Sequence, residues 1–109
     1  MTAPETDSQI LAAVSIIEGR WKTAVLCKLA SKGEMRFTQL MKEIEGISPR
    51  MLTKQLKEME KDGLIARKAY AEIPPRVQYS LTPKGTALIP ILSRMAEWKT
   101  EHTPDDCKR

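Results

Sequence analysis

The chain has 109 residues, a length that suits one domain with a single hydrophobic core. Its 29% charged and 41% hydrophobic residues exclude a disordered chain, and no apolar run approaches the roughly 20 residues of a membrane span. The net charge of +4 is uneven, because residues 20–84 hold 14 Lys/Arg against 7 Asp/Glu. This basic middle part favours an anionic partner such as nucleic acid, although an anionic membrane surface would fit the same charge.

The N-terminus and the two cysteines suggest where the protein works. The first residues, M-T-A-P-E-T-D-S, lack the basic and apolar regions of a signal peptide. Two cysteines cannot form a disulfide framework. Cys27 lies inside a helical apolar pattern, where a small buried side chain is expected, and Cys107 lies in a polar tail. We therefore expect a protein of the reducing cytoplasm, without a membrane partner.

Helical spacing of apolar residues predicts two helices in the first third of the chain, after a disordered arm at residues 1–7. The first helix starts near residue 8 and stops at Gly19, and the second stops at Gly33. A short extended segment, Met35–Phe37, follows. The apolar face of the first helix consists of Ile10, Leu11, Val14 and Ile17. The apolar face of the second helix consists of Trp21, Val25, Leu29 and Ala30.

A third and a fourth helix form the next predicted unit. The third begins with Thr38 as N-cap, and a three-residue turn that contains a glycine ends it. The fourth covers about residues 48–62, because Ser48 is a good N-cap, Pro49 suits the first helical position and Gly63 suits the C-terminal stop. Two helices joined by such a turn are the signature of a helix-turn-helix, whose second helix is the reader.

The predicted reader helix carries two opposed stripes. With Leu52 at 0° on a wheel of about 100° per residue, Leu56 falls near 40° and Met59 near −20°. Four cations, here called the basic file, fall between about 140° and 200° on the same wheel: Arg50, Lys54, Lys57 and Lys61. Such a helix can pack with one side and offer the other to a polyanion. Since most charge files are solvated surfaces, the helix by itself leaves both interpretations open.

After the reader helix the pattern alternates with period two, which predicts a β-hairpin over about residues 64–82. Pro74 and Pro75 cannot continue a ladder of hydrogen bonds and therefore form a stiff tip. Lys68 and Arg76 flank the tip and make the hairpin a basic wing. An ordinary ribbon that closes the core is the alternative, and the two interpretations are compatible.

A last helix is predicted over about residues 83–100, with Thr82 as N-cap and a kink or an open turn at Pro90. A disordered tail at residues 102–109 follows, so one domain covers residues 8–101. The apolar face of the last helix consists of Leu88, Ile91, Leu92, Met95 and Trp98. A small domain has difficulty covering this face and that of the first helix, so we predict that both pack against their twofold mates in a homodimer. The alternative is that the two helices bury each other within one chain.

Several motifs keep this order over about 80 residues. They are E-G-R-W-K at 18–22, M-R-F-T-Q-L at 35–40, G-I-S-P-R-M-L-T-K-Q-L-K-E-M-E-K-D-G-L-I at 46–65, E-I-P-P-R-V-Q-Y-S-L-T-P-K-G at 72–85 and A-E-W at 96–98. With them the chain resembles the HxlR-type bacterial transcriptional regulators, a MarR-like group. The resemblance implies a mainly α fold with a small β-hairpin: a winged helix-turn-helix DNA-binding domain with N- and C-terminal dimerisation helices.

The resemblance also implies a cytoplasmic homodimer that regulates transcription, with repression as the expected mode. It would bind a palindromic operator in double-stranded DNA, with the reader helix in the major groove and the wing on the minor groove or the backbone. Thr38 and Gln39 lie at a helix N-terminus, where amides and the helix dipole favour phosphate. Lys61 and Lys68 complete the basic surface. The residues implied to face the DNA are Ser48, Pro49, Arg50, Thr53, Lys54, Lys57 and, on the wing, Arg76.

The chain departs from the family pattern at one position, and one alternative to the DNA-binding function stays open. Some family members sense oxidants through a cysteine ahead of the first helix, but Ser8 lies near that place here, so a small-molecule effector of unknown identity is the alternative input. No enzyme and no cofactor are expected, since the lone His102 lies in the tail and no Cys/His spacing fits zinc. The rival is a winged-helix module that binds protein without DNA, which would not need four aligned cations.

Overall fold

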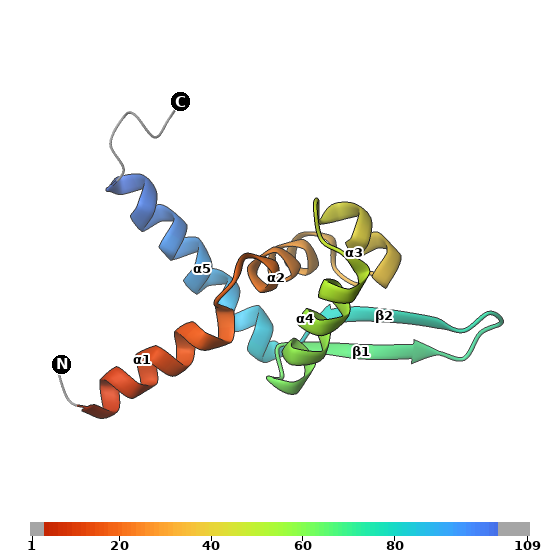
Figure 1. Cartoon of the computed structure of the whole chain (residues 1–109), viewed down its shortest axis with the longest axis horizontal. Helices are drawn as coiled ribbons and strands as arrows, with labels where there is room; N and C mark the ends of the chain where they lie inside the picture. Colours follow the sequence, from red (N-terminus) through yellow and green to blue (C-terminus); the bar gives the residue numbers. More distant parts are fainter. Residues whose placement is uncertain (1–3, 103–109) are drawn as a thin grey trace.

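The computed structural model describes residues 4–102 (Figure 1). Five helices and one two-stranded antiparallel sheet follow one another along the chain. This arrangement confirms the predicted fold class, a mainly helical chain with a small hairpin. No described helix combines the length and the apolar character that a membrane span needs. The elements are α1 (Pro4–Ile17), α2 (Arg20–Lys32), α3 (Phe37–Glu43), α4 (Pro49–Lys61), β1 (Ile65–Tyr70), β2 (Arg76–Leu81) and α5 (Pro83–Glu101).

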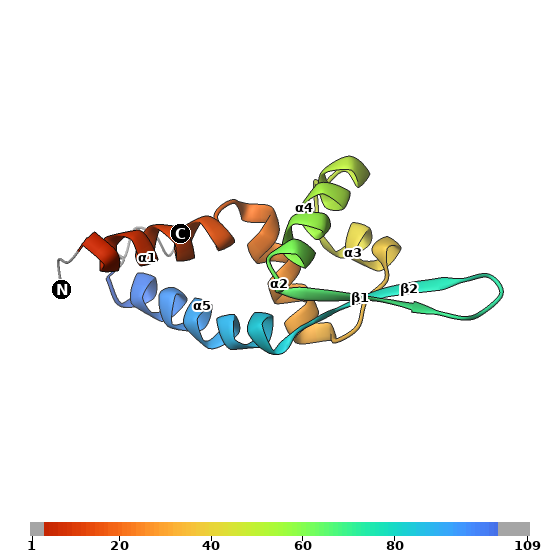
Figure 2. The same ribbon diagram turned by 90° about the horizontal axis from the view of Figure 1, so that it is seen from below.

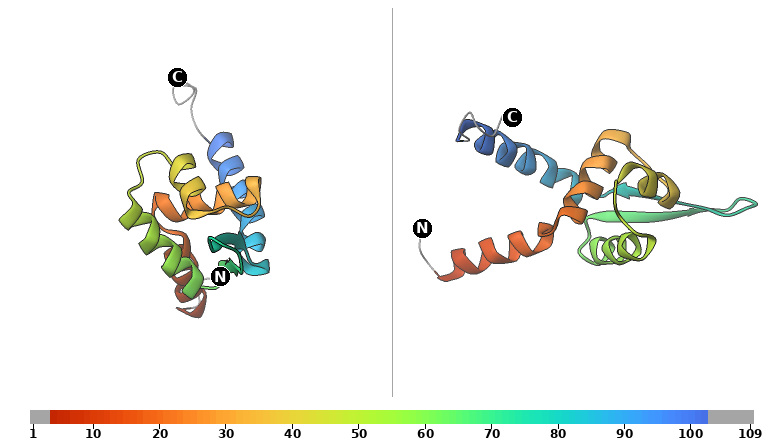
Figure 3. Two further views of the ribbon diagram at one scale, coloured as in Figure 1. Left: turned by 90° about the vertical axis from the view of Figure 1, so that its right-hand side faces the viewer. Right: turned by 45° about the horizontal axis from the view of Figure 1, so that its top comes forward.

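The core lies where α2, α3 and α4 meet the base of the hairpin (Figures 1 and 3). The inner stripe predicted for α4 is confirmed, because Leu52, Leu56 and Met59 are at most 1% exposed. Burial of such side chains stabilises each site by about 1.5–3 kcal/mol. The inner stripe therefore fixes the rotation of α4 about its own axis. The other buried core residues are Val25, Leu26, Leu29, Met35, Leu40, Ile44, Ile47, Leu64 and Ile65.

Two helix starts differ from the expected ones. Helix α1 begins at Pro4, so residues 4–7 are helical where an arm was expected, and a proline suits a first turn because it has no N–H to leave unpaired. Helix α3 begins at Phe37 with Arg36 in place of Thr38 as its N-cap. The backbone N–H of Arg36 donates to Oε1 of Gln39 at 2.8 Å, which satisfies this end of the helix from inside the first turn. The expected tail at 103–109 lies outside the described residues.

The turn between α3 and α4 has the helix-turn-helix geometry that the sequence predicts. Gly46 has a φ of 88°, in the left-handed region that glycine adopts without a steric penalty. Ser48 then caps α4, since its Oγ accepts the N–H of Met51 at 3.0 Å. The two helices of the motif are therefore joined by a short turn and start at defined residues.

The hairpin is fastened to the domain at its base and free at its far end. Its strands pair from Ile65 opposite Leu81 to Tyr70 opposite Arg76. The segment before α3 pairs with β2. The N–H of Met35 donates to the carbonyl of Tyr79 at 2.9 Å, and the N–H of Tyr79 donates to the carbonyl of Met35 at 2.8 Å. The distal half projects beyond all helices (Figures 1 and 2).

The terminal helices leave the core in diverging directions (Figure 1, and Figure 3, right). Helix α5 continues through Pro90, so the proline does not divide it. Ile17, Leu88 and Leu92 lie half-buried against the core. The outer residues of the two predicted faces stay exposed, so these faces do not bury each other within one chain. They are Ile10, Leu11, Val14, Ile91, Met95 and Trp98.

Gly85 is buried where the start of α5 approaches the start of the hairpin. A Cβ on this residue would collide with the carbonyl oxygen of Leu64, which is backbone and cannot rotate away. We expect Gly85→Ala to lower the free energy of unfolding by about 1–3 kcal/mol, because overpacking forces the backbone to shift. Urea denaturation measures the change, with the exposed neighbour Thr86→Ala as control. An unaltered midpoint for Gly85→Ala would contradict the close approach.

Candidate nucleic-acid interface

The outer face of α4 presents the basic file to solvent. All four cations are exposed, and within the described part of the chain none of them forms an ion pair. The buried inner stripe prevents the helix from turning these residues inward. The file, which consists of Arg50, Lys54, Lys57 and Lys61, is therefore an exposed array of positive charge along the 13 residues of α4.

One ion pair joins α4 to α2 beside this file. Nζ of Lys22 lies 2.9 Å from Oε1 of Glu58, and the Lys22 side chain is only 12% exposed. The hydrogen bond and the charge of Lys22 lower the pKa of Glu58 below its ordinary value, and Lys54 lowers this pKa slightly further. The pair engages a carboxylate that would otherwise offset the positive charge of the file.

We expect this ion pair to make a small pH-dependent contribution to stability. A carboxyl whose pKa is lowered in the folded state stabilises that state above its unfolded pKa, and the stabilisation is lost as pH falls through the folded pKa. Wild type should therefore be more stable than Glu58→Gln near neutral pH, and the difference should vanish on acidification. The difference is small because Glu58 is well hydrated.

Paired urea denaturation over a descending pH series measures this difference. Glu60→Gln is the matched control, since Glu60 lies on the same helix and forms no ion pair with a described residue. A gap between wild type and Glu58→Gln that stays constant with pH would show that the pair contributes nothing through its charge.

The N-cap and the first two turns of α4 hold residues expected to face the major groove, and their polar groups differ in whether they are already engaged within the chain. The hydroxyl of Ser48 is engaged as the cap acceptor, and that of Thr53 donates to the carbonyl of Pro49 at 2.8 Å. Ser48 keeps its own hydrogen for donation, and Thr53 keeps acceptor lone pairs. Arg50 is exposed and has no hydrogen bond or ion pair to any described residue. Among these groups, the guanidinium of Arg50 is wholly available to a partner.

Thr38 and Gln39 both lie exposed in the first turn of α3, as expected for phosphate contacts. The structure engages them differently. Oε1 of Gln39 already accepts the N–H of Arg36, so only its Nε2 is left to donate. The Thr38 hydroxyl has no such local contact in the described chain.

Arg76, the expected wing contact, is engaged inside the wing. Its guanidinium lies 4.0 Å from the ring centroid of Tyr70, and its Nη2 lies 2.9 Å from Oε2 of Glu72. The hydroxyl of Tyr70 in turn donates to the carboxylate of Glu34, with oxygen distances of 2.9 and 3.0 Å. The ammonium of Lys68 lies 4.9 Å from the same ring. We call these five residues the wing cluster. The sequence analysis did not identify Tyr70, Glu72 or Glu34 as functional residues. For Tyr70 the usable signal was the cross-strand register, which places it opposite Arg76.

Comparison with known proteins decides the family. Residues 16–107 match the HxlR-like helix-turn-helix family. This chain belongs to that family. The match runs from the end of α1 past the end of α5, so it includes the basic file, the wing and the terminal apolar face of α5.

The relatives and structural neighbours of this HxlR-like chain agree with the match. It is 50% identical over 86 residues to a helix-turn-helix-type transcriptional regulator from Methanothermobacter thermautotrophicus. The aligned segment covers 79% of this chain and 65% of that relative. The chain thus spans just under two thirds of that relative's length. A structure from Enterococcus faecalis V583, assigned to the MarR family of transcriptional regulators, is 40% identical with a TM-score of 0.86, covering 100% of this chain and 97% of the other. The reduced form of the transcriptional regulator YodB from B. subtilis is 33% identical, with a TM-score of 0.81 and coverage of 94% and 96%. All three are transcriptional regulators by name.

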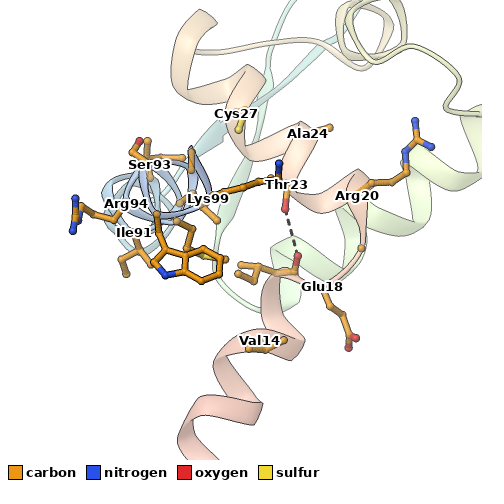
Figure 4. Close-up of a pocket in the computed structure, with 17 residues that line it drawn as sticks. Val14, Glu18, Arg20, Thr23, Ala24, Cys27, Ile91, Ser93, Arg94 and Lys99 are labelled. Atoms are coloured by element: carbon orange, nitrogen blue, oxygen red, sulfur yellow. Dashed lines mark hydrogen bonds between the residues drawn. The ribbon is translucent and has the colours of Figure 1, made fainter. Parts of the chain in front are cut away.

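The HxlR-like chain also has a hollow of about 1220 Å³ between α1, α2 and α5. Figure 4 places Cys27 of α2, Val14 of α1 and Ile91 of α5 around it. Cys27 is exposed, so the expectation of a small buried residue is wrong. The reason is rotational: α2 turns Val25 and Leu29 into the core, and Cys27 lies on the opposite side of the helix. Cys107 lies outside the described residues.

Proposed function

We propose that the chain is a cytoplasmic homodimer that binds a palindromic operator in double-stranded DNA and represses transcription. Helix α4 enters the major groove, and the hairpin contacts the adjacent minor groove or backbone. The observation that carries this proposal is the basic file: four exposed cations, none in an ion pair with a described residue, lie opposite a fully buried apolar stripe. The major groove, about 12 Å wide, admits one α-helix.

The roles within the interface follow from position along α4. The N-terminal end of a reader helix lies deepest in the groove, so Arg50, Thr53 and Lys54 contact base edges. Lys57 and Lys61 lie farther along the helix and bind phosphates, which position the protein without reading sequence. Donors in the first turn of α3 add phosphate contacts from Thr38 and Gln39. Ser48 and Pro49, at the start of α4, face the major groove. Lys68 and Arg76 belong to the wing.

The dimer is supported by the exposed apolar faces of the diverging terminal helices. An apolar surface of this extent marks an interface in water-soluble proteins. A twofold axis between two copies would let α1 and α5 of one chain fill the hollow beside α5 of the other. It would also place the two α4 helices about one helical turn of DNA, or a multiple, apart.

The rival function, a winged-helix module that binds protein alone, makes the opposite prediction for DNA. The test is titration of labelled duplexes, one from the DNA upstream of the chain's own gene and one scrambled, at low and moderate salt. We expect both duplexes to bind at low salt, with affinity falling linearly in log[salt], and the upstream duplex to show two protected half-sites on footprinting. No duplex binding at low salt would favour the protein-binding module.

A further inference from the structure

Apart from Glu72, the tip of the wing is apolar, although the surface behind it is basic. Residues 71–75 read A-E-I-P-P. The side chain of Ile73 is fully exposed, at 101%, and Pro74 and Pro75 are exposed beside it. Figures 1 and 2 show this tip beyond every helix on the wing side of the molecule. An isoleucine held entirely in water contributes no hydrophobic stabilisation to the chain itself.

Arg76, the cation that borders the tip, is not available in the same way. Arg76 stacks on Tyr70 and pairs with Glu72, and its side chain is only 28% exposed. Tyr70 is itself tied to Glu34, which lies beside the strand-like segment that pairs with β2. For Arg76 to reach a phosphate it would have to leave both partners. The cluster therefore stiffens the hairpin behind the tip.

We propose that Ile73 is a DNA contact that enters the minor groove beside the half-site read by α4, while Arg76 acts as a positioning residue that holds the tip. The inference rests on the proposed function. Minor-groove proteins use apolar side chains such as Ile, Leu and Pro in this way, because the groove walls are sugar and base edges. Two prolines at the tip also restrict the backbone beforehand, so less conformational freedom is lost on docking.

The base of the hairpin couples this tip to the reader helix. The N–H of Leu64 donates to the carbonyl of Met59 at 2.9 Å, and the N–H of Thr82 donates to Leu64 at 3.1 Å. Backbone hydrogen bonds therefore join the end of α4 to the start of β1 and to the residue that follows β2. Exposed cations at Arg67 and Lys68 lie between the core and the tip, which suits a polyanion better than an apolar protein surface.

The test uses the full chain with Ile73→Ala, and with Ala71→Ser as a matched control on the same tip. We expect Ile73→Ala to weaken operator binding roughly three- to tenfold through lost apolar contact. The salt dependence should stay unchanged, because no phosphate contact is lost. Ala71→Ser should bind as wild type. Because Ile73 touches no core residue, thermal unfolding of the free variant should match wild type.

Other outcomes separate this inference from the proposed function. If Ile73→Ala binds like wild type while Arg50→Ala is weakened, the tip contact is wrong and the DNA-binding function stands. If the wild-type protein binds no duplex, both the tip contact and the proposed DNA-binding function are wrong. If Ile73→Ala leaves the affinity for the duplex unchanged but alters the sedimentation of the free protein, the tip serves association between copies of the chain. That result would overturn the inference. If Arg76→Ala lowers the salt slope by about one unit, Arg76 contacts a phosphate and is not a positioning residue.

Discussion

Trp98→Glu should turn the proposed dimer into a monomer of about 12.3 kDa and lower operator affinity roughly a hundredfold or more. Trp98 is 63% exposed on the outer half of α5, so the change leaves the core of the single chain intact. In a dimer the same position becomes buried, where an unpaired carboxylate is strongly destabilising. A monomer binds one half-site at a time and loses the high effective concentration of a second, linked α4.

Sedimentation at micromolar concentration gives the mass, and a duplex titration gives the affinity. Thr100→Glu is the control, because it adds the same charge two residues along α5 at an exposed position outside the apolar face. That variant should remain a dimer with about twice the chain mass. A Trp98→Glu protein that sediments as a dimer, or a monomer with full affinity, would refute the assignment of this face.

Arg50→Ala should weaken operator binding by about 1–3 kcal/mol and relax the sequence preference at one position in each half-site. The reason is that the Arg50 guanidinium lies in the first turn of α4 without a hydrogen bond or ion pair to any described residue. In the proposed complex this guanidinium would meet a guanine edge. A scrambled duplex, which offers only phosphates, should lose much less affinity for this variant.

Lys61→Ala is the matched comparison, because it removes a cation from the same file near the other end of α4. It should weaken operator and scrambled duplexes alike and reduce the salt slope by about one unit for the phosphate contact removed. If each variant lowers the affinity for the operator and for the scrambled duplex equally, the basic file does not divide into residues that contact bases and residues that bind phosphates. If neither variant mattered, the file would be only a solvated face.

The sequence by itself determined the elements and their inner faces. Apolar spacing identified the inner stripe of α4, and the cap residues Ser48 and Thr82 bond as predicted to the amides of Met51 and Gly85. These features can be predicted from the sequence because their interactions span at most four residues. Periodicity and capping are set within one helical turn, so the local sequence contains both partners. The start of α3 nevertheless differs from the predicted one, because Arg36 and Gln39 form the cap in place of Thr38.

Only the tertiary structure decided what the outward-facing residues do. The interaction of Tyr70 with Glu34 joins residues 36 positions apart, and the stacking of Arg76 on Tyr70 depends on strand register. The divergence of α1 from α5, and the exposure of Cys27 in the hollow between them, depend on how helices pack on a shared core. A single sequence specifies which residues are apolar or charged, but the contact between distant segments is fixed by the combined packing of all elements. For that reason Arg76, which the sequence predicted as a wing contact, is engaged within the wing, while Ile73 at the tip is fully exposed.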